Sequence, residues 1–121
     1  MKNDIENEIN RLNFEDILWV IFILLSIMNI VSNNYQKEYV VSGNEYYEDM
    51  AGNISIFVLT VLLLIYLYFF IRNYNMYNSK SDLTKADLIK VIGSLFSVIG
   101  PLCLLYFQIH SDDNFISDLE L

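Results

Sequence analysis

The chain has 121 residues, of which 55% are hydrophobic and 18% are charged, and its formal net charge is −8. Soluble domains carry roughly 45 to 50% apolar and about 25% charged residues, so this composition is too apolar for a soluble domain of this length. The apolar residues are also gathered into three runs instead of alternating with polar ones at helical or strand spacing. We therefore predict an all-α membrane protein with three transmembrane helices, forming a single membrane domain over residues 1–121.

The first apolar run covers residues 17–31 and follows an acidic N-terminal tail, residues 1–16. At 1.5 Å per residue the run covers only about 23 Å, which is short for a membrane span. A cleaved signal peptide is the competing interpretation. The acidic character of the preceding segment and the lack of a small-residue cleavage site after the run favour a retained span.

The second and third runs cover residues 54–71 and 88–109. The second contains about fourteen Leu, Ile, Val or Phe residues, which together favour insertion by about 4 to 8 kcal/mol. The third would be about 33 Å long as a straight helix. It carries Lys90 in its first turn, where a long side chain extends to the lipid headgroups.

The cations are distributed unequally between the two sides of the membrane. The N-terminal tail, the loop 72–87 and the start of the third span hold six of them, namely Lys2, Arg11, Arg72, Lys80, Lys85 and Lys90, whereas the outer loop 32–53 and the tail 110–121 hold only Lys37. The positive-inside rule then predicts a cytoplasmic N-terminus and an acidic C-terminal tail outside. Arg72 and Lys90 are the expected charge anchors on the cytoplasmic side.

Two segments outside the spans have helical patterns. Ile5, Ile9 and Leu12 are spaced by four and three residues, which predicts a short amphipathic helix in the N-terminal tail. Thr84 and Asp87 have the spacing of a capping box and predict the start of the third helix.

The outer loop divides into two halves. Residues 35–41 have some strand character, residues 42–44 (Ser-Gly-Asn) break the pattern, and a helix from Glu45 is predicted to extend span two outwards. Glu45, Glu48 and Asp49 share one face of that helix, and we expect a solvated face there rather than a cation site.

Span three carries small residues on one side. Gly93, Ser97, Gly100 and Pro101 predict a helix-packing seam that a neighbouring backbone can approach closely. Pro101 also frees a backbone carbonyl and bends the helix. The seam is expected to serve tight packing, within the bundle or between copies, and the alternative is a hinge or a pore-lining kink. Asn29, near the outer end of span one, is expected to make a polar contact with another helix.

Groups able to perform chemistry are scarce. No Asp, Glu, Arg or His lies in the middle of a span, Cys103 is the single cysteine, and His110 with Asp112 and Asp113 would make an incomplete metal site. The sequence predicts no enzyme, no cofactor, no metal, no nucleic-acid partner and no recognisable small-molecule substrate.

Two functions remain as hypotheses. The first is a non-enzymatic accessory, regulatory or protective partner, which acts through helix contacts with another membrane protein or with copies of itself in the lipid bilayer. The second is a self-assembling pore former, which resembles small phage holins in size and span count. A pore requires a polar stripe, and only the small-residue side of span three approaches one, so the first is favoured. The abundance of Ile, Asn, Tyr, Phe and Lys suggests the plasma membrane of a low-GC bacterium.

Overall fold

The computed structural model describes residues 2–111, which form three helices: α1 (Lys2–Ser42), α2 (Glu45–Ser79) and α3 (Lys85–Ser111). All three are long and apolar enough to cross a membrane. α1 has 41 residues and is therefore about 61 Å long, twice the roughly 30 Å of a hydrocarbon core. The expected acidic tail lies outside the described residues from position 112 onwards.

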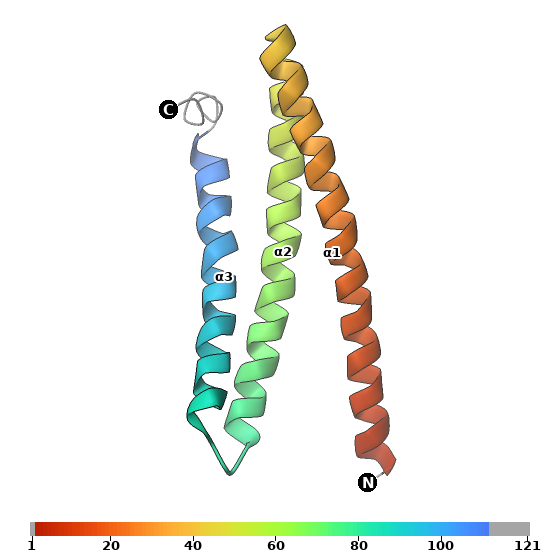
Figure 1. The fold of residues 1–121 in the computed structure, drawn as a ribbon, viewed down its shortest axis with the longest axis vertical. Coiled ribbons are helices and arrows are strands. Elements are labelled where there is room, and N and C mark those ends of the chain that lie inside the picture. Colours follow the sequence, from red (N-terminus) through yellow and green to blue (C-terminus); the bar gives the residue numbers. More distant parts are fainter. Residues whose placement is uncertain (1, 112–121) are drawn as a thin grey trace.

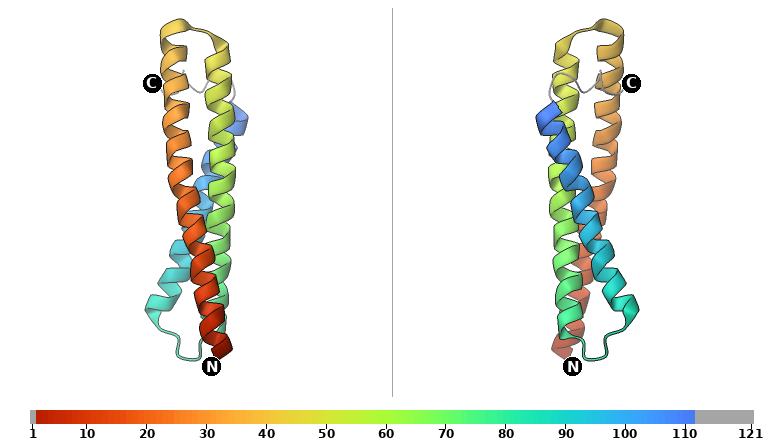
Figure 2. Two further views of the ribbon diagram at one scale, coloured as in Figure 1. Left: turned by 90° about the vertical axis from the view of Figure 1, so that its right-hand side faces the viewer. Right: turned by 90° about the vertical axis from the view of Figure 1, so that its left-hand side faces the viewer.

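The helices run up, down and up, with α2 between the other two (Figure 1). α1 and α3 each pack along α2 and scarcely contact each other. Figure 2 shows that the first turns of α3 diverge from the end of α2. The result is an open bundle in which α2 is the shared element, and both outer helices keep a long exposed side.

The α1–α2 contact follows a seven-residue repeat. Leu18, Leu25 and Ser32 are buried on α1, and Ala51, Val58 and Ile65 are buried on α2, each seven residues from the next. Leu18, Leu25, Val58 and Ile65 make up the hydrophobic core. Such spacing keeps one side of each helix turned towards its partner, as in an antiparallel coiled coil.

Two polar contacts give the register of this pair. The Ser32 hydroxyl donates to the Ala51 carbonyl at 3.1 Å, and the Tyr68 hydroxyl donates to the Glu15 carboxylate at 3.3 Å. Glu15 is 17 residues before Ser32 on α1, and Tyr68 is 17 residues after Ala51 on α2. The register of the two helices is therefore constant between these two contacts. The small side chains of Ser32 and Ala51 let the helices approach closely near the α1–α2 turn.

The strand character expected at residues 35–41 is wrong, because α1 continues through this segment to Ser42. A lone strand would leave its backbone groups without partners, whereas extending an existing helix adds a hydrogen bond for each residue. Tyr35 also stacks on Tyr47 of α2, with ring centroids 6.2 Å apart, so the helical continuation keeps a packing partner.

The break expected at residues 42–44 is confirmed. Gly43 adopts a positive φ of 70°, a conformation that side chains disfavour, and it ends α1. Asn44 then caps α2, since its side chain accepts a hydrogen bond from the Tyr46 N–H at 3.0 Å. The helix predicted from Glu45 begins at that residue and is continuous with span two.

The capping box predicted at the start of the third helix is also confirmed. The Thr84 N–H donates to the Asp87 carboxylate at 2.9 Å, and the Asp87 N–H donates to the Thr84 hydroxyl at 3.3 Å. α2 extends to Ser79, so the connection between α2 and α3 is only residues 80–84, shorter than the loop 72–87 that the sequence suggested.

Candidate functional site

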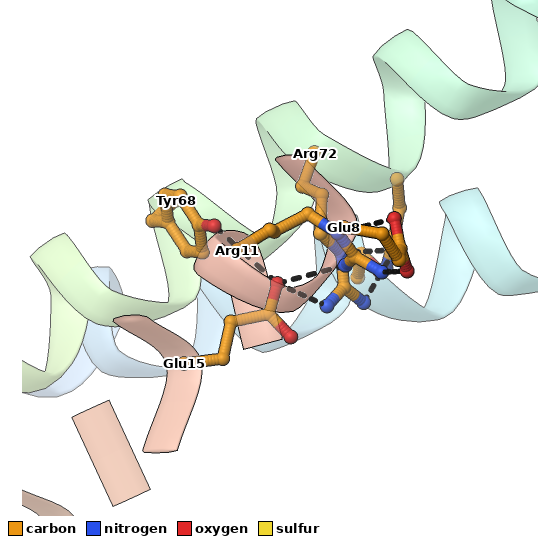
Figure 3. A network of polar contacts seen from close by, with 7 residues as sticks. Glu8, Arg11, Glu15, Tyr68 and Arg72 are labelled. Atoms are coloured by element: carbon orange, nitrogen blue, oxygen red, sulfur yellow. Dashed lines mark hydrogen bonds and ion pairs between the residues drawn. The ribbon is translucent and has the colours of Figure 1, made fainter. Parts of the chain in front are cut away.

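A polar network joins α1 and α2 at the end of the bundle that holds the α2–α3 turn (Figure 3). Its centre is Glu15, which is only 6% exposed. The Glu15 carboxylate lies 2.7 Å from the Arg72 guanidinium and 2.9 Å from that of Arg11, and it also accepts the Tyr68 hydroxyl. One carboxylate therefore receives donors from both helices.

The network continues to α3 through Arg72. This side chain lies over the Phe69 ring, with its guanidinium carbon 5.0 Å from the ring centroid, and donates to the side-chain carbonyl of Asn73 at 2.8 Å. The amide of Asn73, which is buried, donates in turn to the Ser94 hydroxyl of α3. Polar contacts thus link all three helices at one level.

The charges within the network stabilise one another. Burial raises the pKa of the Glu15 carboxyl, but the hydrogen bond and charge of Arg72, together with Arg11, outweigh burial and leave this pKa below its usual value. Arg11 also pairs with Glu8 one turn earlier and lowers the pKa of Glu8. Glu15 is therefore a charged ligand for two arginines at neutral pH, not a proton donor.

A groove of about 280 Å³ lies beside the network, with side chains from all three helices around it. Its lining residues are Glu15, Trp19 and Phe22 of α1, Tyr66, Phe69, Arg72 and Asn73 of α2, and Ser94 and Ser97 of α3. The Trp19 ring stacks on Phe22 at 5.2 Å and lies 5.8 Å from Phe69. The groove therefore has aromatic surface on α1 and α2, and it has small serines on α3.

A second cavity, of about 480 Å³, lies where the end of α2 and the start of α3 diverge. It is lined by Asn73, Met76, Tyr77 and Ser79 of α2, by Lys80 of the turn and by Asp87 and Lys90 of α3. At the end of this cavity nearest the α2–α3 turn, the Lys80 ammonium pairs with the Asp87 carboxylate at 2.9 Å.

The two expected charge anchors differ in their surroundings. Arg72 is held by Glu15 and Asn73, so its charge is used inside the bundle. Lys90 is exposed and forms no ion pair within residues 2–111.

The seam residues of α3 do not share one environment. Pro101 is buried and Ser97 lines the groove, but no atom lies within 4 Å of a Cβ placed on Gly93 or Gly100, apart from their own helix backbone and chain neighbours. On α2, by contrast, a Cβ placed on Gly52 would lie 3.6 Å from the side-chain amide nitrogen of Gln108 of α3. Gly93 and Gly100 are therefore uncovered within the described chain.

Asn29 is likewise exposed, and it makes no hydrogen bond through its side chain to any other residue in the described range 2–111. It follows Phe22 by seven residues, which is two helical turns, so it lies on the side of α1 that borders the groove. Ser97 lies between Gly93 and Gly100 along α3, and its side chain lines the same groove from α3.

The sequence reasoning missed Tyr68 and Asn73 as members of the network. The seven-residue spacing would have placed Tyr68 on the α1 side of α2, three residues after the buried Ile65, but it would not have paired it with Glu15. Among residues 2–111, no three His, Cys, Asp or Glu side chains gather in a way that could hold a metal ion.

Comparison of the chain with protein-family models, with curated proteins and with solved structures found no match.

Proposed function

We propose that this chain is a small non-enzymatic, multi-pass membrane protein that acts as an accessory, regulatory or protective partner of another membrane protein. It does so by accepting a helix of that partner along the groove between α1 and α3. The observation that carries the proposal is the open arrangement of the bundle, in which α1 and α3 pack on α2 and leave a groove between them.

The surface around the groove has the composition of a membrane helix contact. On α3 it offers Ser97 with the uncovered Gly93 and Gly100, where an approaching backbone meets no side-chain obstacle. On α1 it offers aromatic rings and the amide of Asn29, which in hydrocarbon gains from a partner on another helix. A fourth helix in this position would cover both.

Site-specific photocrosslinking in the membrane tests the proposal. A photoreactive residue at Phe22 is expected to capture a partner helix, and Gly93→Leu is expected to abolish the adduct while leaving insertion intact. Leu102→Phe is the matched control, because it adds bulk to an exposed position on the opposite flank of α3 and should leave the adduct unchanged. An equal adduct in the Gly93→Leu variant would contradict the proposal.

We further propose that the N-terminus and the α2–α3 turn lie in the cytoplasm of a bacterial cell and that the α1–α2 turn lies outside. The distribution of lysine and arginine supports this orientation. In a Cys103→Ser background, a cysteine at Lys80 should resist a membrane-impermeant thiol reagent, whereas one at Gly43 should react. The reverse pattern would reject the orientation.

A self-assembling pore is the second candidate, and it is favoured by the polar side chains that line the groove, which include Glu15, Arg72, Asn73, Ser94 and Ser97. The charged lining groups, Glu15 and Arg72, lie at one end of the bundle, whereas a water-filled path needs polar groups along its whole length. Measurement of the membrane potential during expression separates the two functions. Rapid depolarisation supports the pore, and a stable potential together with a crosslinked partner supports the accessory role.

A further inference from the structure

We infer that the cavity between the end of α2 and the start of α3 binds the phosphodiester headgroup of an anionic phospholipid. This cavity shares Asn73 with the groove that is proposed to accept a partner helix, and its other lining residues are different.

The cavity is closed on two sides by contacts between α2 and α3. Towards the middle of the bundle, the amide of Asn73 bonds to Ser94, and towards the turn the ammonium of Lys80 pairs with Asp87. Between these contacts the helices diverge, as Figure 2 shows, and leave about 480 Å³. Small-molecule sites in proteins typically enclose about 300 to 1,000 Å³, so the space suits a headgroup.

The charge of the cavity matches that of a phosphodiester. Lys80 and Asp87 neutralise each other, since Asp87 remains ionised with a pKa lowered to about 2 by Lys80 and Thr84. Lys90 lines the same cavity and has no carboxylate partner within residues 2–111. One uncompensated positive charge therefore faces a space that a singly charged phosphate diester could fill.

The position of the cavity favours a lipid over a free phosphate ion. It lies beside the first turn of an apolar helix, where a span begins and where lysine side chains extend to the headgroups. Met76 supplies apolar surface to the wall, and Tyr77 supplies an aromatic ring with a hydroxyl group. A lipid headgroup with its glycerol attached contacts both kinds of surface, whereas an inorganic ion would leave the apolar part empty.

The test is the thermal unfolding of the purified full chain in a non-ionic detergent, followed by circular dichroism while lipid is titrated. Phosphatidylglycerol is expected to raise the midpoint with a saturable dependence, and phosphatidylcholine is expected to have little effect. Lys90→Gln should weaken the apparent affinity for phosphatidylglycerol about tenfold, because it removes the uncompensated charge. Lys90→Arg should retain it.

Lys85→Gln is the matched control. Lys85 is an exposed lysine in the first turn of the same helix and does not line the cavity, so its loss should change the apparent affinity by less than about twofold. Equal weakening in both glutamine variants, or equal effects of the two lipids, would overturn the inference. A midpoint rise of the same size with inorganic phosphate alone would also overturn it, because the ligand would then be a free anion. Without lipid, Lys90→Gln and the unmodified chain should have equal unfolding midpoints. This equality would show that the substitution removes the lipid site and leaves the fold intact.

Discussion

The Glu15 carboxylate of α1 lies 2.7 Å from the Arg72 guanidinium of α2, across the interface of two antiparallel helices. Both residues lie at the end of the buried stripe formed by Leu18, Leu25, Val58 and Ile65. The same carboxylate receives Arg11 from its own helix. The ion pair therefore depends on the apolar register, since any other pairing of the two stripes would separate the two charges.

Replacing Glu15 by glutamine should destabilise the α1–α2 hairpin by about 1 to 3 kcal/mol, because Arg72 then keeps its charge in a largely buried place without a carboxylate partner. The measurement is the midpoint of unfolding in mixed detergent micelles. Asp16→Asn removes a charge from the adjacent exposed position and should change the midpoint little. If both variants lost the same stability, the ion pair would have no special role.

The two alanines of the chain provide a matched pair for testing the α1–α2 interface. Ala51 is 2% exposed and its carbonyl accepts the Ser32 hydroxyl, whereas Ala86 is exposed in the first turn of α3. Ala51→Leu should cost about 1 to 3 kcal/mol, since the added bulk forces the helices apart. Ala86→Leu should be nearly neutral in the same unfolding assay. A neutral Ala51→Leu variant would show that the helices are not closely packed at this point.

Asn73 connects Arg72 of α2 to Ser94 of α3, and it is buried. Asn73→Ala should therefore loosen the α2–α3 contact at this level, at a cost of about 1 to 2 kcal/mol. Asn75→Ala, at an exposed position two residues later, is the control. Spin labels on the exposed Tyr74 and Ile92 should report a broader distance distribution only for Asn73→Ala. An unchanged distribution would mean that other contacts hold α3 in place.

The α2–α3 turn should weaken in acid. Lys80 and Thr84 lower the pKa of Asp87 from 3.8 to about 2, so its contribution is fully present above about pH 4 and is lost as the pH falls through about 2. Stability falls in acid because, as the pH decreases, Asp87 of the unfolded chain binds a proton at a higher pH than Asp87 of the folded chain. Between pH 4 and pH 2 the unfolding midpoint should fall less in Asp87→Asn than in the unmodified chain. An identical pH dependence of the midpoint in the two proteins would contradict the role assigned to Asp87.

Local features of the sequence were sufficient to predict three long apolar helices, the break at residues 42–44 and the start of α3. The apolar runs predict helices long enough to span a membrane because a lipid-exposed backbone must satisfy its own hydrogen bonds. Gly43 and the Thr84–Asp87 pair mark a helix end and a helix start through contacts within a few residues. The seven-residue repeats of Leu18, Leu25 and Ser32 and of Ala51, Val58 and Ile65 were not predicted, because Ser32 and Ala51 lie outside the apolar runs 17–31 and 54–71.

What the tertiary structure decided depends on residues far apart in the chain. Residues 35–41 are helical because α2 lies alongside and because a single strand has no partner for its backbone. Glu15 pairs with Arg72 of α2, in addition to Arg11 of its own helix, because the apolar register brings Glu15 and Arg72 together. Gly93 and Gly100 remain uncovered because α3 contacts α2 through the adjacent side of the helix, which carries Ser94 and the buried Pro101. Composition determined that these helices suit a membrane, and only packing determined which side of each helix stays exposed.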